Sequence, residues 1–181
     1  MYNQVNGGVN AGSGFEDQLW VMRFRGVALE SDMPFNIPDF LTWPSQAQCR
    51  AAHAFRIQGF STPYTHTSFD PNCVANLKAL LAGGDAIALA IHFDSAWDAM
   101  GPGNDVWNPV QPASAVQNNG HVIVAHGYDD VKKAFRVQNS AGIGWGTQGH
   151  GWIPYSLFAT NYMQAIGAAI RPANVPVPSV V

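Results

Sequence analysis

The chain has 181 residues, of which 47% are hydrophobic, so it can bury the core of one domain. Charged residues make up only 12%, about half the usual share, and the net charge is −3. With 9 Lys and Arg residues and no basic cluster, the composition excludes nucleic acid as a partner. The longest apolar run, residues 86–91, is far too short to cross a membrane, which excludes a membrane partner.

Low charge and abundant Gly and Trp are typical of extracellular β-rich proteins. We therefore expect the full-length form to be secreted, either extracellular or periplasmic. Residues 1–6 contain neither the charged segment nor the apolar segment of a signal peptide. This conflict predicts that the natural protein begins upstream of Met1.

The first half of the chain gives one clear helix. Residues 1–14 are rich in Gly and Asn and predict a loop. Ser13 and Glu16 have the spacing of a capping box, which predicts a helix beginning here and ending at Gly26. Its apolar stripe comprises Phe15, Leu19 and Met22. Residues 27–69 contain many prolines and polar residues and show no periodicity that assigns elements.

A second helix and a buried strand follow. Asp70 and Pro71 have the residue types of a helix start, and Gly83 and Gly84 predict its end. Its buried face comprises Val74, Leu77 and Leu81. Residues 86–93 are continuously apolar, which predicts a strand buried on both faces.

Residues 94–119 form a long predicted loop that contains Trp97 and Trp107 and leads into His121. Loops of this length are usually functional or mobile. Two interpretations stay open: the loop lines a cleft beside His121, or it is an ordinary insertion with buried tryptophans.

The central motif is a predicted antiparallel hairpin. Residues 122–125 are apolar and β-branched and predict a buried strand, and residues 134–139 alternate like a second strand. The polar residues between them predict the turn. A hairpin centred at residue 130 places His121 opposite Asn139, on the same face and within side-chain reach. A register slip by two residues would make them diagonal neighbours, which are still close. An amide at one imidazole nitrogen fixes the ring, and the other nitrogen can then act as a base.

The last third of the chain predicts two more strands, near residues 151–153 and 164–170. Residues 172–181 are rich in Pro and predict a tail without regular structure. Two helices followed by mostly antiparallel strands give an α+β fold class.

The residues around the hairpin resemble the papain family of cysteine peptidases, in its bacterial style. Order, spacing and residue type agree over roughly thirty residues. The matching positions are His121, Gly127-Tyr128, Asn139-Ser140, Trp145-Gly146 and Gly151-Trp152. The resemblance implies a papain-like fold, with an antiparallel barrel-like half and a remnant of the helical half. It covers residues 6–171, so we expect residues 1–171 to form a papain-like peptidase domain.

The resemblance also assigns roles. His121 is implied to be the catalytic base and acid, Asn139 its orienting residue, and Trp145 part of the leaving-group side of the cleft. Gly7 and Gly8 resemble the family's Asn-Gly-Gly in the cleft wall, and Gly120 suggests an open substrate subsite. One position departs from the family: Ala141 stands where the family has a Trp that shields the His–Asn hydrogen bond from water.

The nucleophile is not evident. Neither Cys49 nor Cys73 is followed by Trp or preceded by a Gln placed for an oxyanion hole, as the family pattern requires. Cys73 is predicted at a helix start, where a thiol pKa can fall. We expect the nucleophile segment to lie upstream of Met1. Three pairings stay open: a Cys49–Cys73 disulfide, two free thiols, or Cys49 bonded to an upstream cysteine as the family commonly has.

Two functions follow from the resemblance. The first is a cysteine-type peptidase domain that hydrolyses peptide bonds through a Cys-His-Asn triad, of which this chain supplies His and Asn. The second is a degenerate, non-catalytic domain that binds peptides or protein partners. We expect a polypeptide substrate, and either binding of the missing N-terminal segment or self-association through an uncovered apolar surface around His121, Trp145 and the 94–119 loop.

Histidine spacing gives no metal signature. The six histidines are His53, His66, His92, His121, His126 and His150, and no pair has His-x-His or His-Glu-x-x-His spacing. His121 and His126 differ by five positions, so we expect them to point to opposite faces of the sheet. The sequence therefore predicts no metal and no cofactor.

Overall fold

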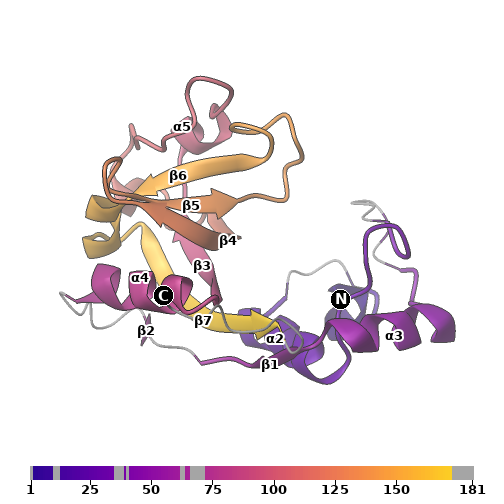
Figure 1. Cartoon of the computed structure of the whole chain (residues 1–181). Coiled ribbons are helices and arrows are strands. Elements are labelled where there is room, and N and C mark those ends of the chain that lie inside the picture. Colours follow the sequence, from indigo (N-terminus) through magenta and orange to yellow (C-terminus); the bar gives the residue numbers. More distant parts are fainter. Residues whose placement is uncertain are drawn as a thin grey trace. The chain divides into compact units, whose positions relative to one another are not determined.

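The structure is a computed structural model that describes residues 2–9, 13–34, 39, 41–61, 64–65 and 72–172 (Figure 1). The chain divides into two compact units. The first comprises residues 1–60 with 171–176, and the second comprises residues 61–170 with 177–181. In the described ranges, no helix has both the length and the apolar character that a membrane span requires.

The first unit is mainly helical. Its elements are α1 (Tyr2–Asn6), α2 (Phe15–Phe24), α3 (Gln46–Ala52), the 3-10 helix η1 (His53–Phe55) and β1 (Ile57–Gly59). β1 pairs antiparallel with the last two residues of β7, Arg171 and Pro172. The short helix α1 falls where the sequence predicts only a loop, so that prediction is wrong over residues 2–6. Residues 173–181 of the predicted tail lie outside the described part of the chain.

The N-cap of helix α2 lies one residue after the predicted N-cap, Ser13. Gly14 occupies the N-cap position and has no side chain to accept a backbone hydrogen bond, so the predicted capping box is wrong. The Ser13 hydroxyl instead accepts from the Gln18 amide at 2.8 Å. A capping box does occur at α3, where Ser45 Oγ accepts from Gln48 N–H and Gln48 Oε1 accepts from Ser45 N–H. The sequence pattern of residues 27–69 had not predicted helix α3 or its capping box.

The end of α2 requires a glycine. Gly26 has φ +83°, a left-handed conformation that a side chain rarely adopts. A Cβ atom there would lie 1.8 Å from the Ala52 carbonyl oxygen. Leu19 is the buried residue of the predicted stripe, and Phe15 and Met22 are half-buried.

The second unit is built on an antiparallel sheet. Its strands are β2 (Tyr64–Thr65), β3 (Ala86–His92), β4 (Gly120–Asp129), β5 (Ala134–Gln138), β6 (His150–Pro154) and β7 (Met163–Pro172). The order is β7-β3-β4-β5-β6, and β2 pairs with β7. Each predicted strand is present with small shifts at its ends, and β3 is buried along nearly its whole length as predicted. These elements confirm the α+β class. Residues 122–125 are buried on one face only, because Val122 is 46% exposed.

Helix α4 (Cys73–Ala82) contacts β3 and β4 and supplies Leu77 to the core, at 1% exposure. Val74 and Leu81, also predicted to be buried, are half-buried. Asp70 and Pro71, the predicted start, lie outside the described residues. The core continues through the sheet and includes Leu89, Ile91, Trp97, Trp107, Ile123, Phe135, Val137 and Ile153.

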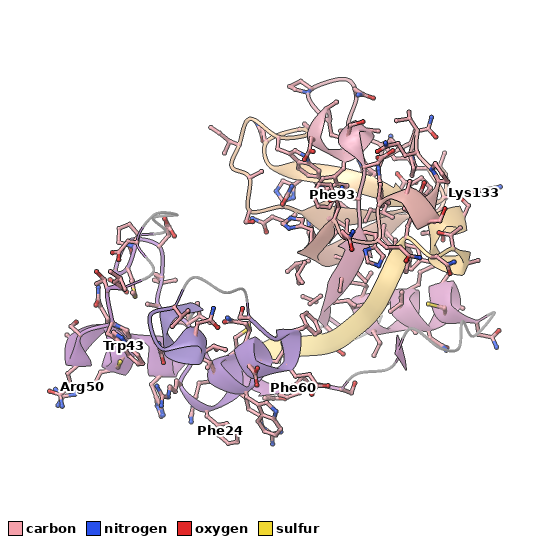
Figure 2. All side chains as sticks on the ribbon, turned by 180° about the vertical axis from the view of Figure 1, so that it is seen from behind. Phe24, Trp43, Arg50, Phe60, Phe93 and Lys133 are labelled. Carbon is pink, nitrogen blue, oxygen red and sulfur yellow. The ribbon has the colours of Figure 1, made fainter. Side chains whose placement is uncertain are left out.

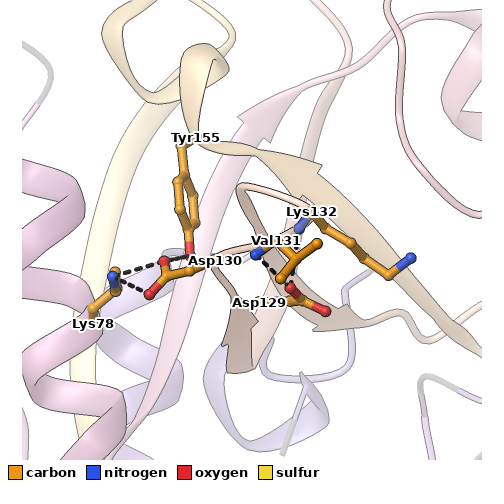
Figure 3. A network of polar contacts seen from close by, with 6 residues as sticks. All are labelled: Lys78, Asp129, Asp130, Val131, Lys132 and Tyr155. Atoms are coloured by element: carbon orange, nitrogen blue, oxygen red, sulfur yellow. Dashed lines mark hydrogen bonds and ion pairs between the residues drawn. The ribbon is translucent and has the colours of Figure 1, made fainter.

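A polar network joins α4 to the β4–β5 turn (Figure 3). Lys78 Nζ donates to both oxygens of Asp130 at 2.7 Å, and the Tyr155 hydroxyl donates to Asp130 at 3.0 Å. These hydrogen bonds lower the pKa of Asp130, whereas burial and the Asp130 contact raise the pKa of Tyr155. Within the turn, Asp129 accepts from two backbone N–H groups, those of Val131 and Lys132. The network therefore fixes the turn to the helix.

Candidate active site

His121 and Asn139 are in contact, as the hairpin predicts. His121 is the second residue of β4, and Asn139 directly follows β5. The His121 Nε2 and Asn139 Oδ1 atoms are 2.7 Å apart. The side chains come from adjacent antiparallel strands, so the predicted hydrogen-bond reach is confirmed.

The predicted register is wrong by two residues at this end. Val124 pairs with Gln138, so Asn139 is in register with Ile123 and not with His121. The error arises because β4 continues to Asp129, which pairs with Ala134, so the turn is centred further along the chain than residue 130. A bulge at His126 adds one residue to β4 and takes back one residue of this shift. The two side chains meet diagonally, which the two-residue spacing allows.

The amide of Asn139 determines which nitrogen of His121 carries the proton. Asn139 Oδ1 also accepts from the backbone N–H of Ser140 at 2.8 Å, so this atom faces a donor and is the carbonyl oxygen. Because a carbonyl oxygen only accepts, His121 donates from Nε2. Nδ1 is then the unprotonated nitrogen of the neutral ring and can accept a proton. The arrangement fits a general base whose tautomer is set by its neighbour.

Aromatic rings surround the imidazole. The Phe93 and Trp97 ring centroids lie 5.8 Å and 6.4 Å from that of His121, both edge-on. Trp97 is 2% exposed and Asn139 is 8% exposed, whereas Ala141 is exposed. The aromatic contacts of His121 thus come from Phe93 and Trp97, whereas the residue at position 141 is an alanine with no ring. The sequence placed Trp97 in a long loop but gave no sign of its contact with His121.

The 94–119 segment is more ordered than predicted. It contains the helix α5 (Ser95–Asp98) and the 3-10 helix η2 (Ala113–Ala115). Trp97 and Trp107 are both buried in the core, and Trp97 also contacts His121. The segment therefore buries its tryptophans, as the second interpretation predicts, and it contacts His121. That it lines a cleft stays a prediction.

Trp145 lies in the core instead of on an uncovered surface. It is 6% exposed, its ring packs 4.6 Å from that of Trp97, and its Nε1 donates to the Trp97 carbonyl oxygen at 2.8 Å. The 94–119 segment therefore covers the Trp145 ring itself, whereas Val110 and Ile143 are exposed. The uncovered apolar surface around His121, Trp145 and this segment stays a prediction, as do the leaving-group role of Trp145 and self-association of the chain.

The remaining predicted contacts are spread over both units. Gly120 is exposed and opens β4 directly beside His121. Gly7 and Gly8 belong to the first unit and have φ +62° and +82°. The geometry above is formed by the second unit alone, so the role of Gly7 and Gly8 in a cleft wall stays a prediction.

The two cysteines lie in different units. Cys49 is exposed on α3, and Cys73 is 3% exposed as the first residue of α4. No disulfide joins them in this structure. Cys73 is part of the core, which leaves its sulfur little access to a substrate.

A second histidine pair lies on the same sheet. His126 Nε2 and His150 Nδ1 are 3.1 Å apart. Burial lowers the pKa of His126, and so do the positive charges of His150 and Arg136. Within the described part of the chain, no three His, Cys, Asp or Glu side chains converge where a metal ion could bind.

Comparison by sequence finds no relatives. No protein-family model matches the chain, and no curated protein matches it.

Solved structures, in contrast, share its fold. Xylellain, a cysteine protease from Xylella fastidiosa, superposes with a TM-score of 0.71 at 22% identity, over 94% of this chain and 66% of xylellain. Procathepsin L2 from the larval midgut of Tenebrio molitor gives 0.65 at 18% identity, over 94% of this chain and 52% of that protein. Bromelain from Ananas comosus, in complex with the E64 inhibitor, gives 0.60 at 19% identity, over 90% and 69%. The chain therefore has the papain-like cysteine protease fold, and it spans from about half to about two-thirds of these proteins.

Proposed function

We propose that this chain supplies the His–Asn part of a papain-like cysteine peptidase domain. The observation that carries the proposal is the 2.7 Å hydrogen bond from His121 Nε2 to Asn139 Oδ1, which leaves Nδ1 as a base. The likeness in fold to proteins named as cysteine proteases supports the reaction type. The substrate of this reaction is a polypeptide.

The pair can act in both halves of the reaction. His121 Nδ1 takes the proton of a thiol, and the thiolate attacks the peptide carbonyl carbon. His121 then returns the proton to the leaving amine as the C–N bond breaks, and water hydrolyses the resulting thioester. Asn139 accepts from Nε2–H in both the neutral and the protonated ring, so the ring keeps one orientation throughout.

Neither cysteine of this chain suits the role of nucleophile. Cys73 is buried in the core, and Cys49 lacks the following Trp and the preceding oxyanion Gln of the family pattern. We therefore propose that the thiolate comes from a segment upstream of the 181 residues, and that these residues alone do not hydrolyse peptides.

The test is hydrolysis of a fluorogenic peptide by the full-length gene product. His121→Ala is expected to lower kcat/KM by about 10²- to 10⁴-fold, which is the usual contribution of general acid–base catalysis. His126→Ala, which removes a histidine from the same strand, is the matched control and should leave kcat/KM unchanged. Equal activity of His121→Ala and the wild type would contradict the proposal. Turnover by the 181 residues alone, lost in His121→Ala, would contradict the placement of the nucleophile.

The second candidate is a non-catalytic papain-like domain that binds peptides. The burial of Cys73, the second unit's only cysteine, favours it. Under this alternative the full-length protein binds a labelled peptide, detected by fluorescence anisotropy, but neither the wild type nor His121→Ala hydrolyses it. An upstream segment without a cysteine would also favour this candidate.

A further inference from the structure

Asp94 is a buried carboxylate at the start of the segment that borders the site. It follows β3 and the half-buried Phe93, and it is 1% exposed. Its Oδ1 accepts from the backbone N–H of Ala96 at 3.2 Å and from Trp107 Nε1–H at 3.0 Å. Its Oδ2 accepts from the backbone N–H groups of Val110 at 2.6 Å and Gln111 at 2.9 Å. The side chain therefore ties the start of the segment to residues 107–111.

These four hydrogen bonds explain why the Asp94 carboxyl group is negatively charged. Burial alone would raise the pKa of Asp94, but the donors from Trp107, Val110, Gln111 and Ala96 outweigh it and lower the pKa. The carboxylate is therefore ionised at neutral pH, and a charged acceptor with four donors makes stronger hydrogen bonds than a neutral one. The Tyr162 hydroxyl, which donates to the Gln111 carbonyl oxygen, holds the same part of the segment.

Helix α5, which Asp94 caps, carries Trp97. Asp94 is the N-cap residue of α5, and Trp97 lies one turn along this helix. The Trp97 ring packs 5.3 Å from Trp107 and 4.6 Å from Trp145, and its edge contact with His121 is 6.4 Å between centroids. Asp94 thus holds Trp97 in two ways: it caps the helix that carries Trp97, and it binds Trp107, against which the Trp97 ring packs.

We propose that Asp94 is a positioning residue for His121: its buried carboxylate holds α5 so that Trp97 packs on the imidazole and keeps water from the His121–Asn139 hydrogen bond. Asn139 Oδ1, the acceptor of this bond, belongs to a side chain that is 8% exposed. A hydrogen bond shielded from water is electrostatically stronger than an exposed one. The inference rests on the proposed function only for the role of His121 as a base, and the experiment below does not require catalysis.

The test is ¹⁵N-resolved NMR of the histidine rings at neutral pH, with His121→Gln used to assign the His121 signals. In the wild type, His121 should carry its proton on Nε2, and this proton should exchange with water more slowly than the ring protons of the exposed His126. Exchange of the His121 proton as fast as that of His126 would overturn the proposal without any substitution at Asp94.

Asp94→Asn is the decisive variant. The amide can accept with one oxygen only, and its NH₂ group then faces the N–H groups of Val110 and Gln111 or of Ala96 and Trp107. We expect exchange of the His121 Nε2 proton to accelerate by at least about tenfold, because hydrogen bonds to a charged group are lost. Asp105→Asn, in the same segment, is the matched control: Asp105 accepts from the Thr147 hydroxyl at 2.9 Å, which an amide oxygen can also do, and His121 should be unchanged.

A folded Asp94→Asn variant with wild-type His121 tautomer and exchange would overturn the proposal. Should this variant fail to fold, Trp97→Phe keeps an aromatic ring of smaller size at the contact and is expected to accelerate exchange in the same way. A folded Trp97→Phe variant with an unchanged His121 would also overturn it. Absence of peptide hydrolysis would leave these readouts intact, so this inference and the proposed function can fail separately.

Discussion

Strand β4 carries two histidines that the structure holds in different ways. His121 is half-buried, packs against two aromatic rings and donates to an amide oxygen that can only accept. His126 is exposed and contacts His150, another imidazole, so either ring of that pair can donate. The comparison teaches that the hydrogen-bond partner sets a histidine's tautomer and the aromatic contacts set its exposure, whereas the strand only sets its position. Changes that remove the cover or the partner should therefore affect His121 and leave His126 unaltered.

The largest effect is expected from Trp97→Ala. This side chain is 2% exposed, and its loss should reduce the free energy of unfolding by about 3–5 kcal/mol, as for other buried tryptophans. Urea denaturation measures the change, and NMR should show that the His121 Nε2 proton exchanges faster while His126 is unaffected. Trp43→Ala is the control: Trp43, labelled in Figure 2, is 53% exposed, so its removal should matter far less. Equal losses from the two variants would break the comparison.

Asn139→Ala should have an intermediate effect. It leaves His121 Nε2–H and the Ser140 N–H without their common acceptor, which should cost about 1–3 kcal/mol of unfolding free energy. The His121 ring should then populate both neutral tautomers, visible in its ¹⁵N shifts. Gln138→Ala, at the exposed neighbouring position, is the control. A single Nε2–H tautomer in Asn139→Ala would show that the aromatic rings alone orient His121.

The smallest effect concerns the pH dependence of the exposed pair. Because burial, His150 and Arg136 lower the pKa of His126 in the folded state, the unfolded chain binds more protons below the ordinary value of 6.5. Stability should therefore fall as the pH drops from 6.5 through the lowered pKa, and His126→Gln should remove part of this loss. Urea denaturation at pH 7.5 and pH 5 measures the difference. An identical pH dependence in His126→Gln and the wild type would contradict the assignment.

Local patterns predicted the elements that local forces determine. Alternation in residues 134–139 and the apolar run of β3 gave the strands, and the hairpin brought His121 and Asn139 together. The register was missed because the polar residues after β4 did not show that the strand continues to Asp129, which moves the centre of the turn. The N-cap of α2 was predicted wrongly because Ser13 lies one position before the actual N-cap, Gly14.

The aromatic cover of the site could not be predicted from local sequence. Trp97 reaches His121 because Asp94 joins two parts of the segment through hydrogen bonds to Trp107, Val110 and Gln111. Such contacts depend on tertiary packing, and neither periodicity nor residue propensity records them. The family resemblance showed only that the shielding Trp of the family is replaced by Ala141, and it gave no sign that Trp97 contacts His121.

The bulge at His126 has a consequence for how β4 tolerates a change in length. Ala125 pairs with Val137 and Gly127 with Arg136, so His126 is the extra residue between two regular ladders. Removing it would join the two ladders without moving any other side chain to the opposite face. Removing a residue elsewhere in β4 would turn part of the strand over, because side chains alternate with a period of two. The deletion at position 126 is therefore expected to preserve the facing of His121 toward Asn139.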